Sequence, residues 1–148
     1  MIELRNHLTS LKKSCILLLV LFALGSHSQV INEIEVKTSD ASNSGMNFGT
    51  VDLELVNLEF KICLIKELDS EGNTFQPGEI DSFTDGELQE CRGFAAPGSG
   101  IGVARLTHHG FDAWTPEWIR IFFDDGTFVQ CDDGFQIDNS EVHDLECN

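Results

Sequence analysis

Apolar and polar residues alternate with a period of two along much of this chain. Between residues 33 and 37, Ile34 and Val36 alternate with charged side chains, and between residues 51 and 55 three aliphatic residues alternate with two acids. This period is typical of a β-strand that buries one face. The pattern predicts strands or short strand segments at residues 30–37, 51–55, 60–64, 80–83, 101–107, 119–123, 127–131, 135–138 and 142–147.

A hairpin within residues 114–131 gives the clearest pattern. Ile119 and Ile121 fall on one side of a strand, and Arg120 falls on the other. Asp125-Gly126 then predicts a two-residue turn, because this pair readily adopts the positive φ that such a turn requires.

Segments rich in glycine, serine, asparagine and proline separate the strands at residues 39–49, 70–78 and 91–100. Such segments are typical of turns and loops. No segment shows a convincing helical period, the nearest candidate being residues 85–92. Seven or eight short strands between turns predict an all-β fold, an antiparallel sandwich of about eight strands.

The first 28 residues have the features of a secretory signal. A basic stretch precedes an apolar run at residues 15–24, and small residues follow at Ser26 and Ser28. The run is shorter than the roughly 20 residues that span a bilayer, so we expect cleavage after Ser28 rather than a transmembrane segment. The mature protein is then one secreted, extracellular domain at residues 29–148.

Four cysteines remain in this expected mature chain: Cys63, Cys91, Cys131 and Cys147. An even number of cysteines in a secreted protein predicts two disulfides, and three pairings are open. Zinc is the alternative, but no C-x-x-C or H-x-x-x-H spacing supports it.

The charge is strongly acidic. Removing the three basic residues and one acid of the signal leaves six of the nine basic and 24 of the 25 acidic residues, a formal net charge of −18 against −16 for the whole chain. Nucleic acid is therefore not an expected partner, because phosphate contacts need lysine and arginine. Direct attraction to an anionic membrane is also disfavoured unless calcium bridges the two surfaces.

Several short motifs occur in a recognisable order. They are Thr38-Ser39-Asp40 after the first strand, Gly49-Thr50 before the second, F-x-x-G-x-x-D-x-F at residues 75–83, Pro116-Glu-Trp118 opening a later strand, and Phe128-Val-Gln-Cys131 in its partner. From about residue 31 to residue 147 this order resembles the PLAT domain, also called the LH2 or lipoxygenase homology domain. The chain departs from the family pattern at Ser39, where the family has glycine, and at Phe135, where it commonly has tryptophan.

The resemblance implies an eight-stranded β-sandwich that binds lipid surfaces or protein partners, usually as an accessory to a catalytic domain. Fold alone does not fix function. Trp118 matches a tryptophan of the family core, and we expect it to pack there. Trp114 and Phe111 lie in a loop, where aromatic side chains can enter a lipid interface. The alternative for Trp114 is that it caps the edge of the sandwich.

Calcium is the one cofactor that the sequence suggests. Asp40, Asn47 and Asp112 lie in or near predicted loops and carry the oxygen ligands that calcium prefers, although no contiguous calcium-loop motif is present. Some members of the PLAT family bind calcium through such loops. Asp81 has a structural alternative, which is to brace the turn next to Gly78.

Catalysis has little support in the sequence. His108 and His109 are adjacent on a strand, so they point to opposite faces and do not easily share a metal, and no nucleophile accompanies them. We therefore expect a non-enzymatic binding module that recognises a lipid or membrane surface, or a protein partner, through loops at one end of the sandwich. The alternative is an acidic extracellular protein-interaction or structural factor that binds a basic protein.

Overall fold

Eight β-strands make up most of the chain that the structure describes. The computed structural model describes residues 29–57, 62–68, 75–84, 86–88, 91, 100–132, 136–138 and 141–148. The expected signal segment and Phe135 lie outside these residues. The strands are β1 (Ile31–Thr38), β2 (Gly49–Asn57), β3 (Ile62–Ile65), β4 (Ile80–Thr84), β5 (Ile101–Gly110), β6 (Pro116–Phe123), β7 (Phe128–Asp132) and β8 (Val142–Cys147). Among the described residues, no helix is both long and apolar enough to cross a membrane.

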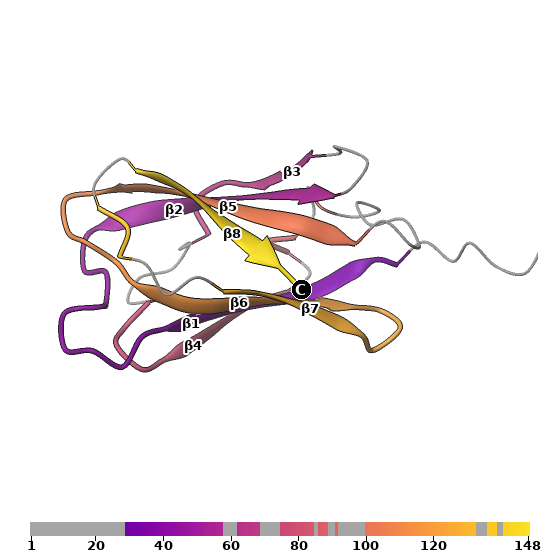
Figure 1. Cartoon of the computed structure of the whole chain (residues 1–148), viewed down its shortest axis with the longest axis horizontal. Coiled ribbons are helices and arrows are strands. Elements are labelled where there is room, and N and C mark those ends of the chain that lie inside the picture. The colour runs from indigo at the N-terminus through magenta and orange to yellow at the C-terminus, as the bar shows by residue number, and fades with distance from the viewer. Residues whose placement is uncertain are drawn as a thin grey trace, which may run out of the picture.

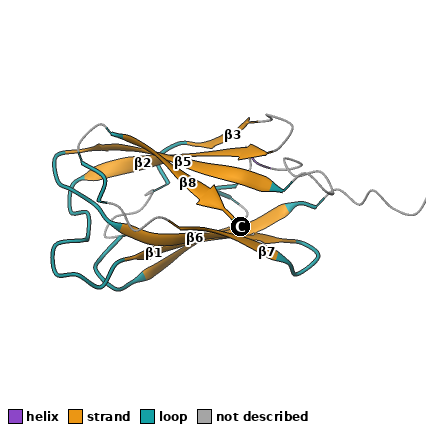
Figure 2. Ribbon diagram, viewed as in Figure 1, coloured by secondary structure: helices purple, strands orange, loops and turns teal. Residues whose placement is uncertain are grey.

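The strands form two layers of one curled sheet (Figure 1). The strand order is β3-β2-β5-β8-β7-β6-β1-β4, and every neighbouring pair is antiparallel. Figure 2 shows β3, β2, β5 and β8 in one layer, with β7, β6, β1 and β4 in the other. The predicted all-β antiparallel sandwich of about eight strands is confirmed.

The core lies between the layers and follows the alternation in the sequence. In β2, Val51, Leu53 and Leu55 are fully buried, while the residues between them are partly exposed. In β6, Ile119 and Ile121 are buried in the same way. Because successive strand residues point to opposite faces, one face of each strand supplies the core and the other meets solvent.

The two layers are joined where β7 meets β8. Only two residue pairs connect these strands, and one of them, Cys131 with Cys147, is a disulfide. A second disulfide joins Cys63 of β3 to Cys91. The expectation of two disulfides is confirmed, and the structure selects one of the three pairings.

The β6–β7 hairpin differs from its prediction in the length of the turn. Gly126 donates its N–H to the carbonyl oxygen of Phe123 (3.0 Å), and Phe123 donates to Thr127 (2.9 Å). Gly126 has a φ of 82°, whereas Asp125 does not have a positive φ. The connection is thus a three-residue loop of a type I turn followed by a left-handed glycine, not a two-residue turn.

Trp118 is not in the core, contrary to its prediction. It lies on the outer face of β6, partly exposed, with the guanidinium of Arg120 4.0 Å from the ring centroid. The physical reason is the strand period, which places Trp118 on the same face as Arg120 and opposite to Ile119.

Candidate functional site

Four segments meet at one end of the sandwich, at the left of Figure 1. We call this the loop end and define it as residues 39–48, 75–79, 111–115 and 136–138. Backbone hydrogen bonds join the segments directly: Met46 N–H donates to the Phe75 carbonyl (3.0 Å), and Thr115 N–H donates to the Ser44 carbonyl (2.9 Å). The loop backbones are therefore joined to one another directly.

Trp114 lies at the centre of this arrangement and is fully buried, with 0% of its surface exposed. Its indole N–H donates to the hydroxyl of Thr38 (3.1 Å), and its ring packs on Phe75 with centroids 4.7 Å apart. Its backbone forms two hydrogen bonds with Ile137 (2.6 and 3.0 Å). Trp114 is thus a core residue that holds the loop end together, and its interpretation as a surface anchor is wrong.

The motif F-x-x-G-x-x-D-x-F builds the neighbouring loop. Phe75 and Gly78 both have positive φ, of 59° and 80°. The carboxylate of Asp81 accepts the N–H of Phe75 (2.8 Å) and holds this turn, which supports the structural interpretation of Asp81. The ring of Phe75 also packs near Phe83, with centroids 6.1 Å apart. The most specific motif in the chain is therefore scaffold for the loop end.

Two exposed aromatic rings project from the loop end. Phe111 is 93% exposed and Phe48 is 73% exposed. The last register pair of β2 and β5 is Gly49 with Gly110. Phe48 precedes Gly49 and Phe111 follows Gly110, so both phenylalanines lie just beyond the paired ends of these strands. We call Phe48 and Phe111 the tip pair. Phe111 was predicted as a surface residue, and Phe48 was missed, although its position just before Gly49-Thr50 places it at the same end.

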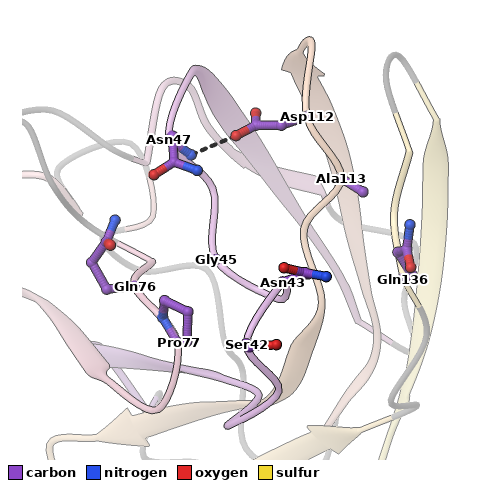
Figure 3. A pocket seen from close by; sticks show the side chains of 9 residues that line it. All are labelled: Ser42, Asn43, Gly45, Asn47, Gln76, Pro77, Asp112, Ala113 and Gln136. Carbon is purple, nitrogen blue, oxygen red and sulfur yellow. Dashed lines mark hydrogen bonds between the residues drawn. The ribbon is translucent and has the colours of Figure 1, made fainter.

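A pocket of about 580 Å³ opens beside the tip pair (Figure 3). Its polar lining comes from all four loop segments: Ser42, Asn43, Asn47, Gln76, Asp112 and Gln136. Asn47 and Asp112 are the chain neighbours of Phe48 and Phe111. Figure 3 shows the amide side chains placed around the opening, with Asp112 beside Asn47.

The pocket side chains use part of their hydrogen-bonding capacity within the protein: Gln76 donates to the Met46 carbonyl (3.4 Å), and Gln136 donates to Asp138 (3.0 Å). Asp112 accepts the backbone N–H of Asn47 through Oδ2 (2.7 Å), but its Oδ1 is buried without a hydrogen-bond partner among the described residues. Within those residues, we find no hydrogen bond from the side chains of Ser42, Asn43 or Asn47. A buried acceptor without a hydrogen-bond partner is unusual in a folded protein.

The three candidate calcium ligands are not brought together as a group. Asn47 and Asp112 are adjacent, but Asp40 binds the ammonium of Lys37 (3.1 Å) and does not line the pocket. Among the described residues, no cluster of three or more His, Cys, Asp or Glu side chains is placed to hold a metal. Among the described residues that line the pocket, only Asp112 has a charged side chain.

The two histidines lie on opposite faces of β5, as the strand period predicts. His109 is exposed and lies 3.1 Å from the carboxylate of Asp52, whereas His108 is fully buried. A Cβ atom on Gly110 would come within 2.4 Å of the His108 ring, which explains the glycine at this position. His108 therefore contributes to packing beneath the tip pair.

Two of the described basic side chains, Lys37 and Arg105, are engaged in ion pairs with acids. Lys37 donates to the carbonyl of Gly78 (2.6 Å) as well as to Asp40. Arg105 forms ion pairs with Asp144 (2.6 Å) and Glu54 (3.2 Å), and Asp144 together with Glu54 raises the pKa of Arg105. No lysine or arginine stands among the described residues that line the pocket.

Comparisons with known proteins support the fold. No protein-family model matches the sequence, and no match was found among curated proteins. Solved structures do match: an alpha-toxin from Clostridium absonum (TM-score 0.61, 16% identity, 84% of this chain and 33% of the toxin) is similar. So are a LOX in complex with arachidonate (TM-score 0.59, 16% identity, 80% and 16%) and a coral 8R-lipoxygenase (TM-score 0.56, 14% identity, 80% and 17%).

This chain has a PLAT/C2-like fold. The similarity supports the fold that the motifs implied, although no family model confirms membership of the PLAT family. The chain spans about a third of the toxin and about a sixth of the lipoxygenase structures. The coral 8R-lipoxygenase is described as undergoing calcium activation through a C2-like domain.

Proposed function

We propose that this protein is a secreted, non-enzymatic module that binds a lipid surface through the tip pair. The observation that carries the proposal is the exposure of two phenylalanines, 73% at Phe48 and 93% at Phe111, which flank the Gly49–Gly110 register pair at the loop end. Large exposed apolar side chains at one end of a domain suit contact with a lipid surface. Two disulfides accord with an oxidising, extracellular compartment.

The energy of this contact supports reversible binding. Burying one phenylalanine stabilises by about 1.5–3 kcal/mol, so the tip pair supplies roughly 3–6 kcal/mol. This is comparable with the marginal anchoring of a single myristoyl chain. Since backbone hydrogen bonds already fix both loops, little ordering entropy opposes insertion.

The charge of the chain indicates which lipids are favoured. With a formal net charge of −16, the protein is repelled by anionic headgroups, and its described cations are mostly paired within the molecule. We therefore expect stronger binding to zwitterionic or neutral lipids than to anionic ones. Added salt should weaken this discrimination, because it screens the repulsion.

Calcium would have a secondary role. The pocket offers Asp112, with one free carboxylate oxygen, and the amide oxygen of Asn47 as ligands. Calcium takes six to eight oxygens, and its affinity rises with the number of charged ligands. One carboxylate supports only weak binding, on the order of the millimolar affinities of extracellular modules. The calcium activation described for the coral lipoxygenase is the reason to include this ion in the test.

Co-sedimentation with phosphatidylcholine vesicles tests the proposal. We expect wild-type protein to bind and the double variant Phe48→Ala/Phe111→Ala to lose binding by at least tenfold, since about 3 kcal/mol or more is removed. Each mixture is prepared with EDTA and with calcium to measure the contribution of the ion.

Phe128→Ala is the matched control. Phe128 is 55% exposed but lies on β7, away from the loop end, so its removal should leave vesicle binding unchanged. The proposal fails if wild-type protein does not bind in either condition, or if the Phe128 variant and the double variant bind equally well.

A further inference from the structure

We propose that the pocket at the loop end binds a neutral sugar ring, either as part of a free glycan or as the headgroup of a glycolipid. The glycolipid source rests on the proposed membrane contact of the tip pair; the free glycan does not. The inference begins from the chemistry of the lining, whose polar side chains are four amides, one hydroxyl and one carboxylate beside Gly45, Pro77 and Ala113.

Amide side chains match the hydrogen-bonding character of sugars. A hydroxyl group both donates and accepts, and each asparagine or glutamine offers two donors and an acceptor. Asn43, Asn47 and Gln76 come from two different loops and line the same pocket, where the amide of Gln76 also donates to the Met46 carbonyl (3.4 Å). A row of vicinal hydroxyls can pair with such a set without any charged partner.

Asp112 supplies the strongest acceptor. Its Oδ2 is committed to the N–H of Asn47, while its Oδ1 is buried and unpartnered among the described residues. Because this oxygen has almost no accessible surface, a sugar hydroxyl would reach it only after the Asp112 side chain rotates toward the opening; hydrogen bonds to an ionised acceptor are stronger than neutral ones.

Other ligand classes fit the pocket less well. Phosphate and sulfate would lack a counter-charge, because no lysine or arginine lines the described part of the pocket. A divalent cation would meet only one carboxylate. An apolar molecule would leave the amides without partners, and most pockets for such ligands are lined mainly by apolar groups.

The pocket has the size and rigidity for one or two sugar rings. Its volume of about 580 Å³ falls within the ordinary range for small-molecule sites. The loop backbones are held by Trp114 and by bonds such as Met46 to Phe75 (3.0 Å), so the amides start from a fixed frame. The adjacent tip pair offers aromatic faces against which the C–H surface of a sugar can pack.

The first experiment measures free sugars in EDTA by ligand-observed NMR, with methyl glycosides of glucose, galactose, mannose and N-acetylglucosamine. A small polar ligand in an open site should bind with a dissociation constant on the order of millimolar. Asn43→Ala and Asp112→Asn should each weaken the best ligand roughly five- to tenfold, because each removes about one hydrogen bond.

Asn32→Ala provides the matched control, as Asn32 is an exposed asparagine at the opposite end of β1. It should leave sugar binding unchanged, and equal unfolding midpoints should show that all three variants are folded. The proposal is overturned if no sugar of the panel binds, or if the pocket variants bind it as well as the control does.

The second experiment separates the two sources. Vesicles of phosphatidylcholine alone are compared with vesicles that also contain galactosylceramide or glucosylceramide. A glycolipid source predicts that the ceramide raises wild-type binding and that the Asn43→Ala and Asp112→Asn variants lose only this increase. A free-glycan source predicts sugar binding in NMR without any increase on vesicles. Loss of all vesicle binding with retained sugar binding would refute the proposed membrane contact and leave the sugar site standing.

Discussion

The two ends of the sandwich differ in how fully their polar side chains are hydrogen-bonded. At the β6–β7 hairpin, Asp125 accepts hydrogen bonds from the backbone and hydroxyl of Thr127 (2.9 and 2.6 Å) and from Gln29 (2.7 Å). At the loop end, Ser42, Asn43 and Asn47 make no side-chain hydrogen bond to another described residue. A polar side chain that hydrogen-bonds within its own turn is not available to a ligand. A side chain on a loop whose backbone is held by other hydrogen bonds remains available.

Trp114 joins the segments of the loop end, so its removal should have the largest effect on the free energy of unfolding. Replacing a fully buried tryptophan by alanine costs about 3–5 kcal/mol of unfolding free energy. Trp114→Phe should cost about 1–2 kcal/mol, because it keeps most of the packing and loses the hydrogen bond to Thr38. Urea denaturation measures both values.

Trp118→Ala is the comparison for this prediction. Trp118 is partly exposed and packs on Arg120, a contact worth about 0.5–1 kcal/mol on a surface. If Trp118→Ala destabilised the protein more than Trp114→Ala, the assignment of the two tryptophans to surface and core would be wrong.

The same two residues show what the sequence could reveal. Alternation in β1, β2, β5 and β6 was enough to predict the sandwich, because strand period and burial are directly linked. That period also places Trp118 beside Arg120 on the outer face, yet the motif match favoured the core. For Trp118, the alternation of the strand predicts the observed face and the motif match does not, since a motif shared with a family does not fix the direction of one side chain.

The candidate site was less accessible from the sequence than the fold. Phe111 could be found because it lies in a short loop between two strong strands. The burial of Trp114 depends on Thr38, Phe75 and Ile137, which are distant in the chain and meet only in the folded protein. The pocket likewise draws its lining from four separate loops, so no spacing in the sequence marks it.

The disulfide between β7 and β8 tests whether the loop end depends on closure of the two layers. Cys131→Ala/Cys147→Ala should lower stability by about 3 kcal/mol, as expected for a link across 16 residues. Because Trp114 and the loop backbones lie elsewhere, vesicle and sugar binding should persist below the unfolding transition. Urea titration followed by binding measurements checks both statements, and binding lost at full native population would contradict the second.

Glycines at the two ends should respond differently to substitution. A Cβ atom on Gly45 would lie 2.5 Å from Cδ of Pro77 and 3.0 Å from the Phe75 carbonyl oxygen. Gly45→Ala should therefore push two pocket loops apart, cost about 1–3 kcal/mol, and weaken ligand binding. Gly126 has open space around it but a φ of 82°, so Gly126→Ala should cost about 1 kcal/mol of strain and leave binding intact. Thermal unfolding together with vesicle sedimentation distinguishes these outcomes.

The smallest effect should be a pH dependence confined to the hairpin end. Hydrogen bonds from the Thr127 hydroxyl, from Gln29 and from the Thr127 backbone lower the pKa of Asp125 below its ordinary value of 3.8. A carboxyl with a lower pKa in the folded state stabilises the fold above its unfolded pKa and loses this contribution as the pH falls through the folded value. Asp125→Asn should therefore be slightly less stable than wild type at neutral pH, and the difference should shrink as the pH falls below about 4 and disappear only below the lowered pKa of the folded state. Thr127→Val should reproduce much of this loss, and the double variant should add little, because both substitutions remove the same interaction.

Urea midpoints measured across acidic pH test this, and a difference between wild type and Asp125→Asn that persists unchanged in strong acid would show that the hairpin is held by something other than these hydrogen bonds.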